Sequence, residues 1–140
     1  MWSKHKGAII WCSIILFLLV LPFAYFSAWG QDQVADAVAK NKDKPWAPEW
    51  QERVGNTHFY LGRYPEAEKA FANWLKYWPY NPENPGRYPD IHFKWAMALE
   101  ESPGRRDDAQ VAFEQFVETW PEHPKLNDAR NAIIRCKNWR

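Results

Sequence analysis

The pattern of apolar and polar positions divides the chain into an uncharged N-terminal run and a longer region with helical periodicity. Residues 7–30 contain no charged side chain. A helix of that length spans about 36 Å at ~1.5 Å per residue, which is enough to cross a hydrocarbon core of ~30 Å. We therefore predict a single transmembrane helix over residues 7–30.

The flanks of this run indicate whether it is retained. Trp2 and Trp29 lie near its two ends, where aromatic side chains favour the membrane interface. A cleaved signal peptide is the alternative, because Lys4 and Lys6 form a basic start and residues 28–30 are a possible cleavage site. The uncharged run is longer than the ~7–15 residues of a signal-peptide core, which favours a retained anchor.

The charges on either side of the run predict its orientation. Residues 1–6 contain Lys4 and Lys6 and no acid, whereas Asp32 and Asp36 are the first charges on the other side. The excess of positive charge on cytoplasmic flanks places residues 1–6 in the cytoplasm. In a bacterium, the protein is then expected in the inner membrane with its C-terminal region in the periplasm.

Beyond the run, the sequence predicts a stalk and an all-α domain. Residues 31–47 are polar with a weak helical stripe, and we predict a stalk or helical continuation there. In residues 48–140 apolar side chains recur at helical spacing, and nothing alternates with period two. Pro near the first turn, or Asp107 as an N-cap, marks the start of each predicted helix. The predicted helices are 48–61, 65–78, 89–101, 107–120 and 124–138.

Residues 66–82 and 108–124 nearly repeat each other. The identical pairs are Ala67/Ala109, Ala70/Ala112, Phe71/Phe113, Trp78/Trp120, Pro79/Pro121 and Pro82/Pro124. Small Ala side chains let a neighbouring helix approach, and the Phe one turn later fills the space between them. Such self-similarity at a fixed spacing is typical of helical repeat proteins.

These motifs resemble the tetratricopeptide repeat, a helix–turn–helix unit of about 34 residues. The residues that carry the resemblance are Gly55, Gly62, Tyr64, Ala67, Phe71 and Pro79 in a repeat at about 48–81, and Gly104, Ala109, Phe113 and Pro121 in a repeat at about 90–123. Met97 departs from the pattern, because the family has a small residue there. The resemblance implies a short α-solenoid of two repeats, with 124–138 as a capping helix.

The resemblance also implies a groove that binds protein segments. The groove positions on the first helices would be Glu52, Asn56, Phe59, Tyr60, Ile91, Lys94 and Ala98. Glu52 stands where some relatives have a Lys that clamps a terminal carboxylate, so capture of a carboxylate is not expected. Eight extra residues separate the two repeats. This loop is either a tolerated insertion or a second partner contact through Tyr80, Arg87 and Tyr88.

Composition and residue spacing give no indication of nucleic-acid binding or of a catalytic, metal or cofactor site. The chain carries a net charge of +1, and basic residues are scattered among acids, so nucleic-acid binding is not expected. The four His lack metal-ligand spacing, and no nucleotide or nucleophile motif occurs. We therefore predict no catalytic, metal or cofactor site and no small-molecule substrate. His58 is expected to be a packed ring, and Cys136 a small buried side chain that forms no disulfide with Cys12.

The sequence therefore favours a non-enzymatic, membrane-anchored protein-interaction module. The expected partners are the bilayer and other protein subunits. The leading hypothesis is a small accessory or assembly subunit of a respiratory or photosynthetic inner-membrane complex. The alternative is a free periplasmic chaperone-adaptor for exported proteins or cytochrome maturation.

Overall fold

The protein is all-α, as the sequence predicted. The computed structural model describes the backbone of residues 2–138 and the side chains of residues 14–138, and no strand occurs in that part of the chain. The seven helices there are α1 (Trp2–Phe26), α2 (Ala28–Lys40), α3 (Ala47–Tyr60), α4 (Tyr64–Tyr77), α5 (Tyr88–Glu101), α6 (Arg106–Thr119) and α7 (Leu126–Asn138).

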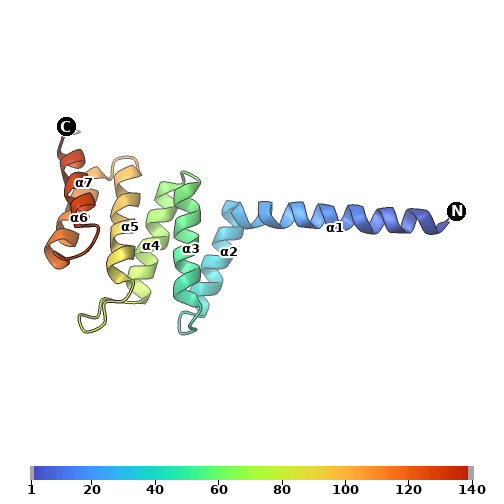
Figure 1. The fold of residues 1–140 in the computed structure, drawn as a ribbon, viewed down its shortest axis with the longest axis horizontal. Coiled ribbons are helices and arrows are strands. Elements are labelled where there is room, and N and C mark those ends of the chain that lie inside the picture. Colours follow the sequence, from blue (N-terminus) through green and yellow to red (C-terminus); the bar gives the residue numbers. More distant parts are fainter. Residues whose placement is uncertain (1, 139–140) are drawn as a thin grey trace.

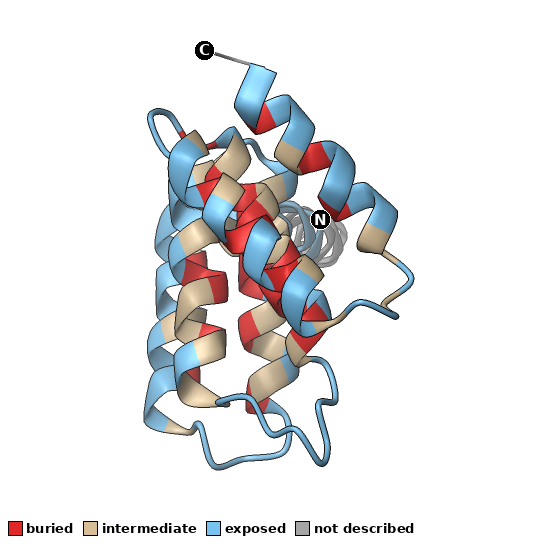
Figure 2. Ribbon diagram, turned by 90° about the vertical axis from the view of Figure 1, so that its left-hand side faces the viewer, coloured by how far each residue is buried: buried red, intermediate tan, exposed pale blue. Residues whose placement is uncertain are grey.

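The helices pack like a helical repeat. Each helix makes its main contacts with the next one in the sequence. Helices α2–α7 stand beside one another in a stack, and α1 projects from one end of it (Figure 1). Seen along α1, the buried positions gather where neighbouring helices meet, and the outer faces are exposed (Figure 2).

The predicted helix bounds hold to within two residues, but the start of α7 is two residues late and the predicted N-cap of α6 is wrong. Helix α7 begins at Leu126 rather than at Pro124, because the backbone N–H of Lys125 donates to His123 Nδ1 at 3.2 Å and holds a turn there. Helix α6 begins at Arg106, with Arg105 as its N-cap. Asp107 therefore lies in the first turn, where a carboxylate favours the helix dipole.

Two apolar clusters form the core, one between α4 and α5 and one among α5, α6 and α7. The first contains Ala67, Phe71, Trp74, Ile91 and Ala98. The second contains Phe93, Ala96, Leu99, Ala109, Ala112, Phe113, Phe116, Ala129, Ala132 and Cys136. The repeated Ala and Phe positions thus lie in the core, as predicted from their spacing. Cys136 is buried and forms no disulfide with a described residue, whereas the side chain of Cys12 lies outside the described residues.

Gly55 allows α3 to approach α4 closely. A Cβ at this position would lie 2.4–2.8 Å from ring atoms of Phe71, which is only 1% exposed. We expect Gly55→Ala to destabilise the fold by about 1–3 kcal/mol through overpacking, despite the better helix propensity of Ala. Denaturant unfolding followed by circular dichroism measures this, with Thr57→Ala in the same helix as control. Equal stability of Gly55→Ala and wild type would contradict the close packing.

The uncharged N-terminal run contains a bend. Helix α1 ends at Phe26, and α2 starts after Ser27. Within residues 14–138 no single helix is both long and apolar enough for a membrane span. Residues Ile14–Phe26 and Ala28–Lys40 meet that criterion only as a pair bent by 69°. The predicted span 7–30 therefore includes the bend, and the side chains of its residues 7–13 lie outside the described part.

The bend is stabilised by side chains that cap the last carbonyls of α1. Ser27 Oγ donates to Ala24 O at 2.6 Å, Gln31 Nε2 donates to Tyr25 O at 2.6 Å, and Arg63 Nη1 donates to Phe26 O at 3.1 Å. Gly30 is required here, since a Cβ on it would lie 2.0 Å from Ala24 O. Side chains of α2 and of the turn between α3 and α4 thus stabilise the bend through hydrogen bonds to the end of α1.

Residues 31–40, predicted as part of a stalk, belong to the packed stack. They continue α2, which lies against α3. Gln31 and Val38 are fully buried there. Trp29, predicted at the membrane interface, lies in the first turn of α2 and is 68% exposed. The side chain of Trp2, predicted at the other interface, lies outside the described residues.

Candidate interaction site

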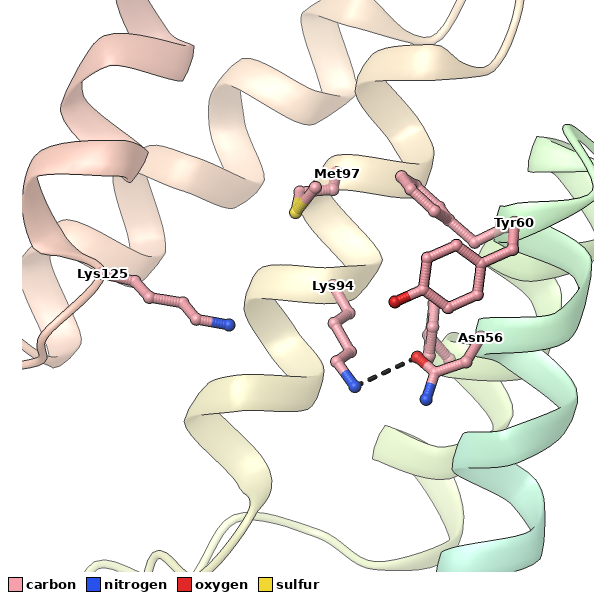
Figure 3. A pocket seen from close by; sticks show the side chains of 7 residues that line it. Asn56, Tyr60, Lys94, Met97 and Lys125 are labelled. Carbon is pink, nitrogen blue, oxygen red and sulfur yellow. Dashed lines mark hydrogen bonds between the residues drawn. The ribbon is translucent and has the colours of Figure 1, made fainter.

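A cavity of about 250 Å³ lies between α3 and α5. Its lining comes from four parts of the chain: Asn56, Phe59 and Tyr60 in α3, Phe71 in α4, Lys94 and Met97 in α5, and Lys125 before α7. Figure 3 shows Tyr60 and Asn56 facing Lys94 and Met97, with the Lys125 side chain extending toward them from the other side. Four predicted groove residues, Asn56, Phe59, Tyr60 and Lys94, are therefore brought together.

An ion-pair network fixes the charge at the edge of this cavity. Lys94 Nζ donates to Glu52 Oε1 at 2.7 Å and to Asn56 Oδ1 at 3.0 Å. Arg87 Nη1 donates to the other carboxylate oxygen, Glu52 Oε2, at 3.1 Å. Glu52 thus joins α3 to α5 and to the loop before it. The Lys94 ammonium is thus engaged by Glu52 and Asn56 within the protein.

The second cation of the cavity is also engaged. Lys125 Nζ lies 5.0 Å from the centre of the Phe93 ring and 3.7 Å from Asp90 Oδ1. Tyr60, in contrast, is 86% exposed. With both ammonium groups satisfied and aromatic rings on the walls, the cavity suits an apolar or aromatic side chain of a partner.

Two of the predicted groove positions do not face the groove. Ile91 and Ala98 are fully buried in the first apolar cluster. They support the wall from behind and cannot contact a partner. The error arises because both lie on the α5 face that packs on α4.

The predicted loop contacts are part of the fold. The Tyr88 ring lies 5.3 Å from Tyr80, 6.1 Å from Trp120 and 6.3 Å from Trp74, and burial raises the pKa of its phenol. Arg87 is held by Glu52. Tyr80 and Tyr88 therefore join the first repeat to the second, and the partner contact at this loop stays a prediction.

Sequence reasoning missed three lining residues. Helical spacing predicts Phe71 as a core residue alone, and the repeat pattern marks Met97 only as larger than the residue expected there. The large Met97 side chain, at a position where the family has a small residue, was the one sequence feature that could have indicated its place in the cavity wall. Lys125 gave no signal, because only the path of the chain before α7 brings it to α5.

In the described part of the chain, no three His, Cys, Asp or Glu side chains gather as a metal site would require. His58 is 3% exposed, and burial lowers its pKa, with Arg63 adding to the effect. It is a packed ring, as predicted.

Comparison with known proteins adds no relative. The chain matches no model of a known protein family, and a search of characterised proteins finds no similar sequence. The tetratricopeptide resemblance therefore remains a prediction, and the function must be argued from the residues of this chain.

Proposed function

We propose that this protein is a non-enzymatic, membrane-anchored interaction module with a tetratricopeptide-like domain. It serves as a small accessory or assembly subunit of a multi-subunit inner-membrane complex. The observation that carries the proposal is the apolar segment 14–21 of α1, whose side chains are exposed on all sides of the helix, attached to a packed helical-repeat stack that has a cavity between its helices.

The exposed surface of α1 supports the anchor. All eight side chains from Ile14 to Leu21 are large and apolar, and they are 43–67% exposed. Eight consecutive residues cover every side of a helix, and a helix that is apolar all round needs lipid or protein around it. The backbone of α1 is helical over 25 residues, a length of about 37 Å.

The arrangement of the domain supports the interaction role. The cavity between α3 and α5 lies where the tetratricopeptide family binds protein segments. Its apolar walls and exposed Tyr60 offer contact area, and Tyr is frequent at binding hot spots. Two repeats form a shallow groove, so a short stack of this kind gains stability from a neighbouring subunit.

A pull-down tests the proposal. The full chain, tagged at its C-terminus, is purified in mild detergent, and the eluate is separated on a native gel and identified by mass spectrometry. We expect one large membrane complex at fixed stoichiometry. Unrelated exported proteins in the eluate would favour the periplasmic chaperone-adaptor, and the protein alone would contradict the subunit hypothesis.

A matched pair of variants locates the contact. Tyr60→Ser removes the exposed aromatic ring at the cavity and is expected to weaken co-purification at least about tenfold. Ile134→Ser, a control on α7, removes an apolar side chain that is 55% exposed and should leave co-purification unchanged. If both variants behave like wild type, the groove is not the contact surface.

A further inference from the structure

The end of α1 that meets the stack has all of its carbonyls hydrogen-bonded within the protein. The last four carbonyls of a helix have no partner inside that helix and usually bond to water or to a cap. Here Phe23 O accepts from the backbone N–H of Ser27 at 3.0 Å. The carbonyls of residues 24–26 accept from the side chains of Ser27, Gln31 and Arg63. This helix end therefore needs no water, and it can lie where water is scarce.

Exposed apolar side chains continue past this helix end. Phe26, the last residue of α1, is 49% exposed, and Trp29, in the first turn of α2, is 68% exposed. Leu61, which is 45% exposed, belongs to the turn between α3 and α4. Arg63 of the same turn donates to Phe26 O at 3.1 Å and so ties that turn to the end of α1. These four residues form the elbow surface.

The bend fixes how the elbow surface is placed relative to the axis of α1. Segments 14–26 and 28–40 meet at 69°, and a Cβ on Gly30 would collide with Ala24 O. If α1 runs along the membrane normal, α2 runs closer to the plane of the bilayer than to the normal. Helix α1 joins the stack at α2, and α7 lies at the opposite end (Figure 1). The elbow surface is therefore at the end of the stack nearest to the bilayer.

We propose that the elbow surface lies in the headgroup layer of the phospholipid bilayer and holds the repeat stack against the membrane. Trp favours this layer, because its ring is apolar and its indole N–H is polar. Arg63 uses one N–H for Phe26 O, and its other donors have no hydrogen-bond partner among the described residues. A guanidinium binds phosphate oxygens through a planar fork of donors. The elbow surface thus matches a layer that has acyl chains on one side and phosphates on the other.

This inference rests on the proposed anchor and goes beyond it. An anchor alone requires only that α1 crosses the bilayer, and it leaves the stack free to stand away from the lipid. The elbow surface adds a second lipid contact, made by the turn between α3 and α4. The anchor and the second contact are measured on different side chains, so either can fail without the other being misjudged.

Nuclear Overhauser spectra of the full chain in phosphatidylcholine nanodiscs test the proposal. The protein is deuterated, with protonated methyl groups on Ile and Leu. We expect cross-peaks from Leu61 to the choline protons of the headgroup. Ile134 on α7, which is 55% exposed, is the matched control and should show cross-peaks to water only. Leu16, Leu18 and Leu19 should show cross-peaks to acyl-chain protons, which tests the anchor by itself.

The outcomes separate the two claims. If residues 16–19 contact the acyl chains and Leu61 contacts only water, the anchor stands and this inference is overturned. That result is expected if a protein subunit, rather than lipid, covers the elbow surface. If no α1 methyl group contacts the acyl chains, the anchor and this inference both fail.

A variant then tests the role of the guanidinium. Arg63→Met removes the donor to α1 and the group that would bind phosphate, so we expect the cross-peaks between Leu61 and choline to be lost while α1 keeps its contacts with the acyl chains. Arg53→Met removes an exposed guanidinium from α3 and should keep the Leu61 cross-peaks. An unchanged methyl shift of Leu99, which is fully buried, verifies that each variant is folded. Retained Leu61 cross-peaks in Arg63→Met would overturn the assignment of Arg63 to the elbow surface.

Discussion

Replacing Phe113 by Ala is expected to lower the free energy of unfolding by about 3–5 kcal/mol. Phe113 is fully buried, and its ring lies 5.6 Å from that of Phe93. It fills the space between α5, α6 and α7. Five buried residues of the apolar cluster around Phe113 are Ala, at positions 96, 109, 112, 129 and 132.

These neighbours explain why the loss should be near the top of the usual range. Ala has no rotamers with which to fill a void, so the cavity left by the ring would persist. Denaturant unfolding of the full chain, followed by circular dichroism, measures the change. Tyr60→Ala is the control, because a ring that is 86% exposed should alter stability by no more than about 0.5 kcal/mol. If Phe113→Ala unfolds at the same midpoint as wild type, the assignment of this ring to the core is wrong.

The parts of the fold that depend on local spacing were predictable. The Ala and Phe at 67 and 71, and their repeat at 109 and 113, indicated both core clusters, because helical periodicity alone places them on one face. Pro48, Pro65 and Pro89 marked helix starts, since a missing N–H is harmless in the first turn.

The bend between α1 and α2 was not predictable from spacing. Pro22 lies inside α1, yet the chain turns at Ser27 instead. The turn depends on Arg63, which donates to Phe26 O from 37 residues away. Contacts across such a sequence separation leave no periodic signal.

The candidate site was predictable only in part, for the same reason. The resemblance to the tetratricopeptide repeat implied the α3 residues of the cavity and Lys94 on α5 as groove positions. The partners of Tyr88, in contrast, come from Trp74 and Trp120, on two other helices. The sequence alone therefore left open whether the loop before α5 is a tolerated insertion or a partner contact, and it gave no sign of these contacts within the chain.

The stability of the fold is expected to fall by about 3 kcal/mol through His92 alone as the pH drops from 7 to 4. This imidazole is 7% exposed and lies among the rings of Trp95, Phe116 and Trp120, at 5.4, 6.3 and 5.2 Å. Its Nδ1 has no hydrogen-bond partner among the described residues. Burial lowers its pKa from 6.5 to about 4.

The sign follows from which state binds the proton. Below pH 6.5 the unfolded chain protonates His92, whereas the folded protein does not do so until about pH 4. Falling pH therefore stabilises the unfolded state across this window, and the loss levels off below it. His58 has a lowered pKa as well and acts in the same direction, so the wild-type curve alone cannot isolate His92.

The comparison with His92→Phe isolates it. Phe keeps a ring among the aromatic side chains and does not titrate, so the contributions of His58 and of the carboxylates cancel in the difference. Denaturant unfolding of both proteins at pH 4, 5, 6 and 7 should show the variant gaining about 3 kcal/mol on wild type as the pH falls. Trp95→Phe, which alters the same cluster without changing a titratable group, should keep the wild-type slope. A constant difference between His92→Phe and wild type across this range would mean that folding does not lower the pKa of His92.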